Sequence, residues 1–186
     1  FRKAMLTLPP ITARALLNDE FEGSPILGVG ITGSGGGPVA EVVGGRHVNE
    51  LVAQTRAAGE FHADARTIIE IGGQDSKFLS VDWNAESGRM ALVDFAMNTL
   101  CAAGTGAFLD QQAERLDISI ENEFATIAMQ ADQPARVAGR CTVFAKSDMI
   151  HLQQRGTPLP AILAGLCQSL ARNFTVVIGK GKAFRP

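Results

Sequence analysis

Residues 98–110 read Asn-Thr-Leu-Cys-Ala-Ala-Gly-Thr-Gly-Ala-Phe-Leu-Asp, which places a cysteine and a Gly-Thr-Gly turn before a helical pattern. Leu109, Ala113 and Leu116 recur at helical spacing, so we predict an amphipathic helix with Cys101 at or just before its start. A helix start offers unpaired N–H groups and partial positive charge, which favour anions and thiolates. The stretch therefore suits a phosphate or a thiolate-bound iron cluster. A buried free cysteine beside a plain tight turn is the alternative.

A second informative stretch is the polar turn Gly-Gly-Gln-Asp-Ser-Lys at residues 72–77. Its flanks predict an antiparallel meander of three strands, over residues 67–71, 78–82 and 90–97. Glycines allow backbone N–H groups to approach a phosphate closely, and Lys77 and Asp75 are candidate partners for phosphate and magnesium. An ordinary hairpin with polar decoration is the alternative, although the Gln-Asp pair after Gly-Gly adds nothing to turn stability.

The composition limits the classes of function. With 186 residues and 46% hydrophobic residues, the chain is long and apolar enough for a core, either one domain or two partial lobes. A net charge of -2 lacks the basic surplus of a nucleic-acid-binding protein. No uninterrupted apolar run predicts a membrane span, and we expect a cytoplasmic protein. Three cysteines are an odd number, so they favour metal or redox chemistry over a disulfide framework.

The first third of the chain predicts a buried strand over residues 26–32, ending in a glycine-rich turn at 33–37. Its glycines match G-x-G-x-x-G, but the β-branched residues between them place them in the strand, whereas a dinucleotide fingerprint needs them in a turn that opens a helix. A helix is predicted from about Val48 to Gly59.

The last third predicts further helices and one strand. Residues 120–131 read as a helical surface insertion, and residues 140–145 as a short strand. Ser147 is a predicted N-cap of a helix that Gly156 ends. Thr157 is predicted to cap the next helix, with Pro158 at its first position. Cys167 is predicted to be a core residue, because it lies on one face of that last helix with four apolar residues. The residues of this face are Leu163, Cys167, Leu170, Phe174 and Val177.

Three motifs, in this order and spacing, resemble the activator ATPases of 2-hydroxyacyl-CoA dehydratases and the ATPase subunits of benzoyl-CoA reductase; they are residues 71–77, 98–106 and 140–145. The resemblance implies the acetate and sugar kinase, Hsp70 and actin fold, an α/β architecture of ribonuclease-H-like lobes with a mixed sheet and flanking helices. It further implies that residues 1–64 are the C-terminal part of a first lobe. Residues 65–186 would form the second lobe without its adenosine motif.

The same resemblance implies ATP, Mg²⁺ and a [4Fe-4S] cluster as cofactors. The second phosphate loop would consist of Gly72, Gly73, Asp75 and Lys77. Gln74 would be the catalytic residue, near the γ-phosphate and the hydrolytic water. The nucleotide cleft would be lined by Gly104, Thr105 and Gly106. The cluster ligands would be Cys101 and Cys141. ATP hydrolysis would drive an electron from the cluster into a CoA-ester dehydratase or reductase component.

A cubane cluster takes four thiolates and this chain offers two in motif positions, so two copies are expected to meet as a homodimer. Lys146 and Asp148 stand where dehydratase activators usually carry glutamates, which makes the chain more like multi-module relatives with paired tandem ATPase modules. The family's first phosphate loop is not found in the sequence, and we expect an excised fragment. Two alternatives remain, a small-molecule kinase or regulatory sensor with structural cysteines, and a lobe without activity of its own.

Overall fold

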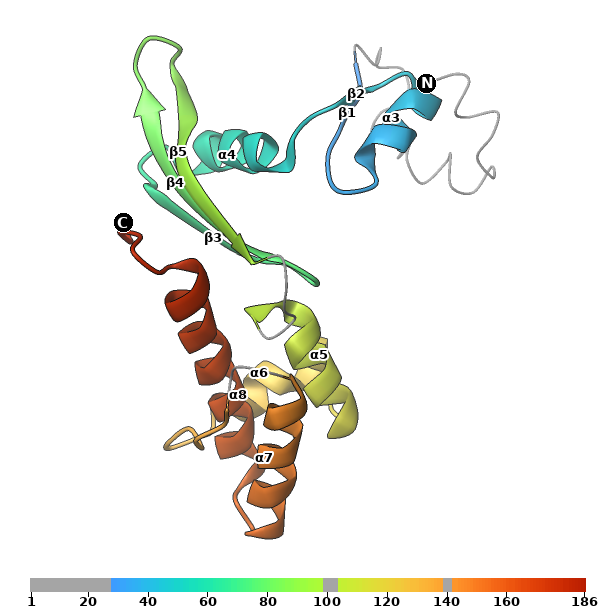
Figure 1. The fold of residues 1–186 in the computed structure, drawn as a ribbon, viewed down its shortest axis with the longest axis vertical. Helices are drawn as coiled ribbons and strands as arrows, with labels where there is room; N and C mark the ends of the chain where they lie inside the picture. The colour runs from blue at the N-terminus through green and yellow to red at the C-terminus, as the bar shows by residue number, and fades with distance from the viewer. Residues whose placement is uncertain (1–27, 99–103, 139–141) are drawn as a thin grey trace. The chain divides into compact units, whose positions relative to one another are not determined.

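The computed structural model describes residues 28–98, 104–138 and 142–186, and within these the chain has the predicted α/β fold (Figure 1). Its elements are β1 Gly30–Ile31, α3 Gly36–Val43, β2 Arg46–His47, α4 Glu50–Phe61, β3 Thr67–Ile71, β4 Ser76–Asn84, β5 Arg89–Asn98, α5 Gly106–Arg115, the π-helix η3 Ile120–Phe124, α6 Ala125–Ala128, α7 Thr142–Gln154, α8 Leu159–Asn173 and the π-helix η4 Phe174–Ile178.

The chain divides into two compact units. The first consists of the described residues up to Ala63 together with Trp83–Ala91, and the second of Asp64–Asp82 and Leu92–Pro186. The correspondence of these units to the predicted lobes, residues 1–64 and 65–186, stays a prediction.

In the first unit, β1 and β2 form a parallel pair, with Ile31 opposite His47, and α3 connects them. Of the strand predicted over residues 26–32, the structure describes residues 28–32, and only Gly30 and Ile31 of these form a strand. Helix α3 was not predicted, and it starts immediately after the turn that contains Gly33 at φ +93°. Gly30 lies in β1, as the sequence predicted, whereas Gly33 lies in the turn that opens α3. Position 36 requires a glycine, because a Cβ there would lie 2.7 Å from the His47 ring.

Helix α4 confirms the helix predicted from about residue 48 to 59. The Asn49 side chain accepts a hydrogen bond from the Leu51 N–H at 2.9 Å, which satisfies one of the free donors at the helix start. The helix continues to Phe61, because Gly59 packs against the hairpin of β4 and β5 where a Cβ would lie 2.7 Å from Met90 Cβ.

The three-stranded sheet, most of which belongs to the second unit, has the order β3-β4-β5, which confirms the predicted meander. Strands β3 and β4 are antiparallel, with Glu70 opposite Lys77, so β4 begins at Ser76, two residues earlier than predicted. Phe78 of β4 is buried against Phe174 and Ile178 of η4.

The helices of the second unit share one hydrophobic core, made by Phe108, Ala113, Phe124, Val137, Ala145, Met149, Ile162, Leu163, Leu166 and Leu170. Because Phe124 is 3% exposed within this core, the prediction of a mere surface insertion over residues 120–131 is wrong. The strand predicted over residues 140–145 is also wrong for its described part. Helix α7 starts at Thr142 and contains Ser147, since burial of Ala145 and Met149, one helical turn apart, outweighs the local strand preference.

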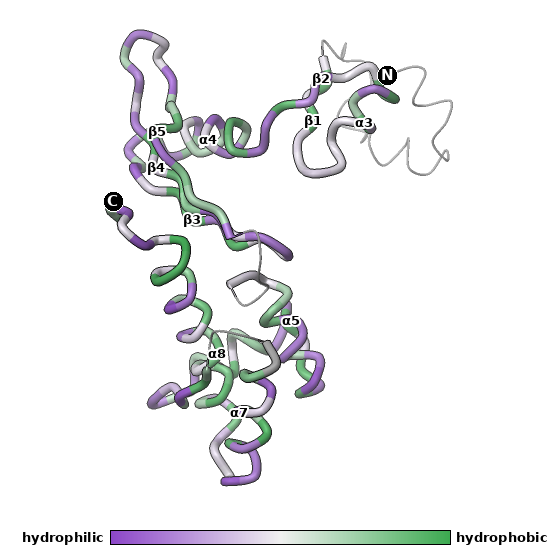
Figure 2. Tube along the Cα trace, in the orientation of Figure 1, coloured by the Kyte–Doolittle hydropathy of each residue, from purple (hydrophilic) through white to green (hydrophobic). Residues whose placement is uncertain are grey.

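Helix α8 begins one residue later than predicted, with Pro158 as N-cap. Of the face predicted to be buried, Leu163, Leu170 and Phe174 are buried, whereas Val177 is exposed. The buried residues also include Leu166 and Ser169, whereas Cys167 is exposed and the prediction of a core cysteine is wrong. Partial desolvation still raises the pKa of the Cys167 thiol. Residues Leu159–Ile178 are long and apolar enough to cross a membrane by length and composition alone, contrary to the expectation from the sequence. Both hydrophobic and hydrophilic residues occur along this helix, as Figure 2 shows, and its buried residues belong to the core.

Gly165 of α8 lies against the segment that precedes α7. A Cβ at this position would overlap the carbonyl oxygen of Ala135, which a backbone shift alone can relieve. We expect Gly165→Ala to lower the free energy of unfolding by about 1–3 kcal/mol, because overpacking forces the backbone apart. Urea denaturation checks this, with Gly37→Ala in α3 as the control, since no described atom lies within 4 Å of its Cβ position. Equal stabilities of the two variants would contradict the prediction.

Candidate functional site

The turn between β3 and β4 is closed by a hydrogen bond from the Gly72 N–H to the Asp75 carbonyl oxygen, at 2.9 Å. A Cβ on Gly72 would lie 2.9 Å from Asp75 Oδ1 and from Glu70 Oε1, so a side chain there would displace both carboxylates. Gly73 differs, because no described atom lies within 4 Å of its Cβ position. The space on the side-chain face of Gly73 is therefore open to a ligand, as a phosphate-binding turn requires. Gln74 lies exposed at the tip of the same turn.

This turn is hydrogen-bonded to the start of α5. The Gly106 N–H donates to the Gly72 carbonyl oxygen at 2.7 Å, and the Ala107 N–H donates to the Gly73 carbonyl oxygen at 2.9 Å. A Cβ on Gly106 would lie only 3.2 Å from the Gly72 oxygen, which explains a glycine there. The structure thus brings together the two glycine segments that the sequence singled out, through hydrogen bonds between residues 34 positions apart in the chain.

Two buried side chains support the junction. Ser76 is fully buried, and its hydroxyl donates to the Gly104 carbonyl oxygen at 2.5 Å. Thr105, the N-cap of α5, is also fully buried. The backbone positions of Gly104, Thr105 and Gly106 are thereby fixed against the turn.

The N–H groups at the start of α5 are not free, contrary to the sequence argument for a bound anion. Those of Gly106 and Ala107 bond the turn, and that of Phe108 donates to the Thr105 carbonyl oxygen at 3.1 Å. The helix also begins at Gly106, further from Cys101 than predicted. An anion would therefore bind at the turn, beside Gly73, and not at the first N–H groups of α5.

Lys77 lies between two carboxylates. Its Nζ atom is 2.6 Å from Glu70 Oε2 and 3.0 Å from Asp75 Oδ2, and the side chain is 1% exposed. Glu70 and Asp75 keep 26% and 40% of their side-chain surface exposed. The three groups sum to one net negative charge, and hard oxygen ligands of this kind suit Mg²⁺. Lys77 positions both carboxylates, and its predicted contact with phosphate stays a prediction.

Glu70 is a site residue that the motifs alone did not indicate. The signal was present in the hairpin, because antiparallel pairing around the 72–75 turn sets residue 70 opposite Lys77, and opposite charges favour such cross-strand pairs.

The predicted cluster ligands, Cys101 and Cys141, lie outside the described residues. Among the residues that the structure describes, no group of three or more His, Cys, Asp or Glu side chains could hold a metal ion. The cluster assignment therefore stays a prediction that rests on the sequence motifs.

The fold and the site define a class of protein, an α/β protein with a glycine turn built onto a helix start. The sequence model of the BadF/BadG/BcrA/BcrD ATPase family matches residues 13–185, and the chain belongs to this family.

Relatives and solved structures agree with the family. The chain is 35% identical to the 2-hydroxyisocaproyl-CoA dehydratase activator of Clostridioides difficile over 72% of this chain and 48% of the relative. It is 31% identical to a subunit of benzoyl-CoA reductase from Thauera aromatica over 67% of this chain and 42% of the relative. The solved activator of the 2-hydroxyisocaproyl-CoA dehydratase from Clostridium difficile, with bound ADPNP, superposes with a TM-score of 0.77 at 32% identity. That match covers 92% of this chain and 59% of the solved one. The chain thus spans about half the length of the curated relatives it matches.

Proposed function

We propose that the protein is an ATPase that activates a CoA-ester dehydratase or reductase component. The observation that carries this proposal is the pair of hydrogen bonds that joins the Gly72-Gly73 turn to the start of α5, because it brings the two glycine motif segments together in one place. The family match and the similarity to a dehydratase activator and to a reductase component support the choice of partner.

Each described residue of the site has a part in this activity. The open space beside Gly73 receives the phosphates of ATP, and the exposed Gln74 orients the attacking water. Asp75 and Glu70, which Lys77 positions, are the residues that would help to hold Mg²⁺. Bound Mg²⁺ supplies charge neutralisation at the phosphates.

The finer proposal is electron transfer. Cys101 and Cys141 of two copies or two tandem modules hold one [4Fe-4S] cluster, which supplies one-electron chemistry to the partner component. The free thiols that this requires fit a cytoplasmic protein.

Cysteine variants of the whole protein, purified without oxygen, test this proposal. We expect the wild-type protein to be brown, to contain iron and sulfide, and to hydrolyse MgATP. The Cys101→Ala/Cys141→Ala double variant should lose iron and colour and retain ATP hydrolysis, because the cluster ligands are separate from the glycine turn.

The third cysteine provides the matched control. Cys167 is exposed on α8, and Cys167→Ala should retain both iron and hydrolysis. A wild-type protein without iron would refute the electron-transfer part alone, whereas absence of ATP hydrolysis would refute the whole proposal.

A further inference from the structure

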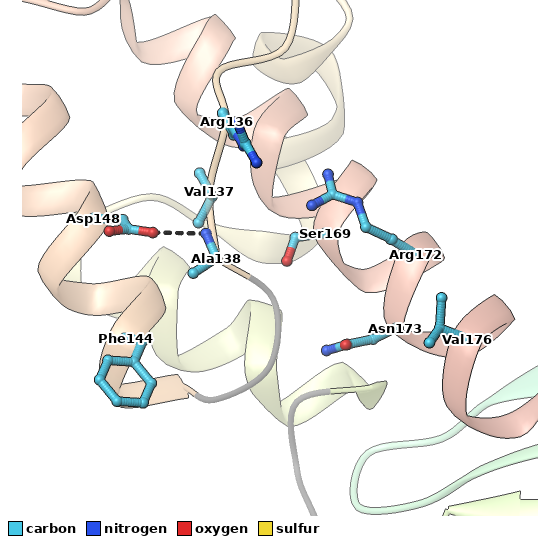
Figure 3. A pocket seen from close by; sticks show the side chains of 9 residues that line it. All are labelled: Arg136, Val137, Ala138, Phe144, Asp148, Ser169, Arg172, Asn173 and Val176. Atoms are coloured by element: carbon cyan, nitrogen blue, oxygen red, sulfur yellow. Dashed lines mark hydrogen bonds between the residues drawn. The ribbon is translucent and has the colours of Figure 1, made fainter.

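A pocket of about 560 Å³ lies in the second unit, between the segment that precedes α7, helix α7 itself and the end of α8 (Figure 3). This volume is within the usual range for small-molecule sites in proteins. The pocket is separate from the residues assigned to ATP, because none of its lining residues belongs to the 72–77 turn or to residues 104–106.

Ser169 of α8 lines this pocket, and within the described part of the chain its hydroxyl group lacks the hydrogen bond that a buried hydroxyl normally makes. The residue is fully buried, and its Oγ atom has no hydrogen-bond partner among the residues that the structure describes. Burying a hydroxyl without a partner costs on the order of 1–3 kcal/mol, so buried polar groups normally find one. A polar ligand in the pocket supplies the missing partner.

The charges around the pocket select the sign of that ligand. Arg136 and Arg172 contribute guanidinium groups, and Figure 3 shows both side chains on the lining. The opposing charge is the Asp148 carboxylate, which already accepts a hydrogen bond from the Ala138 N–H at 2.7 Å. Two cations against one anion leave one net positive charge, and guanidinium forks match the oxygens of carboxylates and phosphates.

The remaining wall is apolar. Val137 is buried, whereas Phe144 and Val176 line the pocket with 65% and 61% of their surface exposed. Exposed apolar side chains beside paired cations favour a ligand with both an oxyanion and a short hydrocarbon part. We infer that this pocket binds a small organic anion, with its oxyanion on Arg136, Arg172 and Ser169 and its apolar part against the apolar part of the wall.

Titration calorimetry of the whole protein tests the inference, with butyrate and inorganic phosphate as separate probes for the carboxylate and phosphate forms of the oxyanion. We expect saturable binding of at least one probe. Ser169→Ala should weaken that binding about tenfold, because a hydrogen bond to a charged group is lost. The same variant should retain or raise the melting temperature, since it removes an unsatisfied buried hydroxyl. Arg172→Gln should weaken binding by a similar factor.

Arg155→Gln is the matched control, because Arg155 is exposed and does not line the pocket. It removes the same charge and should leave binding within about twofold of the wild-type value. Absence of saturable binding for both probes would overturn the inference. Phosphate binding that Ser169→Ala leaves unchanged would also overturn it, because such binding belongs to the glycine turn. An equal loss in Arg155→Gln would reduce the effect to overall charge and would overturn it too.

Discussion

The Glu70→Gln/Asp75→Asn double variant is expected to have a free energy of unfolding about 3–5 kcal/mol below that of the wild-type protein, because it removes both carboxylates that contact the buried ammonium of Lys77. Lys77 is 1% exposed and bonds both carboxylates, at 2.6 Å and 3.0 Å. Each single variant should lose far less than the double variant, since the remaining carboxylate still faces the ammonium. Urea denaturation of the two single variants and the double variant measures this non-additivity.

An exposed ion pair provides the control. Lys182 and Asp94 also approach to 2.6 Å, but the Asp94 side chain is 53% exposed. The hydrogen bond with Lys182 lowers the pKa of Asp94, yet solvent screening should leave Asp94→Asn with little effect on the free energy of unfolding. A double variant at residues 70 and 75 that is no less stable than Asp94→Asn would show that Lys77 does not depend on its two partners.

Gln74→Ala is expected to lower kcat for MgATP hydrolysis about 100-fold or more, because loss of the group that positions the attacking water raises the barrier of the chemical step. Gln74 is exposed at the tip of the turn, and the hydrogen bonds that hold the turn are made by backbone groups and by Ser76. The variant should therefore keep the melting temperature and KM of the wild-type protein. Steady-state kinetics and thermal denaturation of the whole protein measure the three quantities.

Gln130→Ala is the matched control, because Gln130 is an exposed glutamine after α6. It should hydrolyse ATP at the wild-type rate. If Gln74→Ala raised KM and left kcat unchanged, Gln74 would bind the nucleotide instead of assisting the reaction.

The sheet was predictable because its signals are local. Strands β3, β4 and β5 are rich in apolar and β-branched residues and are separated by short polar turns, so their approximate positions and order follow from the sequence alone. The α7 region was not predictable in the same way. The run Thr142-Val143-Phe144 favours a strand locally, and only the burial of Ala145 and Met149 against α8 makes it a helix. The prediction that Cys167 lies in the core was wrong for a related reason. Helical spacing alone does not say which residues at the edge of an apolar face are buried.

The sequence predicted which residues form the site better than it predicted the hydrogen bonds and ion pairs between them. Motif glycines indicated the 72–75 turn and Gly106, and the structure brings them within hydrogen-bond distance. The sequence could not reveal that the Lys77 ammonium is buried between carboxylates, because Glu70 looks like an ordinary alternating strand residue. Nor could it reveal that the first N–H groups of α5 are already bonded, since that depends on the approach of a distant turn.

Those two backbone hydrogen bonds have a mechanical consequence. Because Gly106 and Ala107 are both bonded to the turn, a displacement of Gly72 and Gly73 would also move the first residues of helix α5. Helix α5 has ten residues, hence a length of about 15 Å, and a tilt of about 5° at its start shifts its far end by roughly 1 Å. Phe108, in the first turn of α5, and Ala113, near its other end, are both buried in the helical core. A displacement of the turn is therefore expected to reach this core through α5.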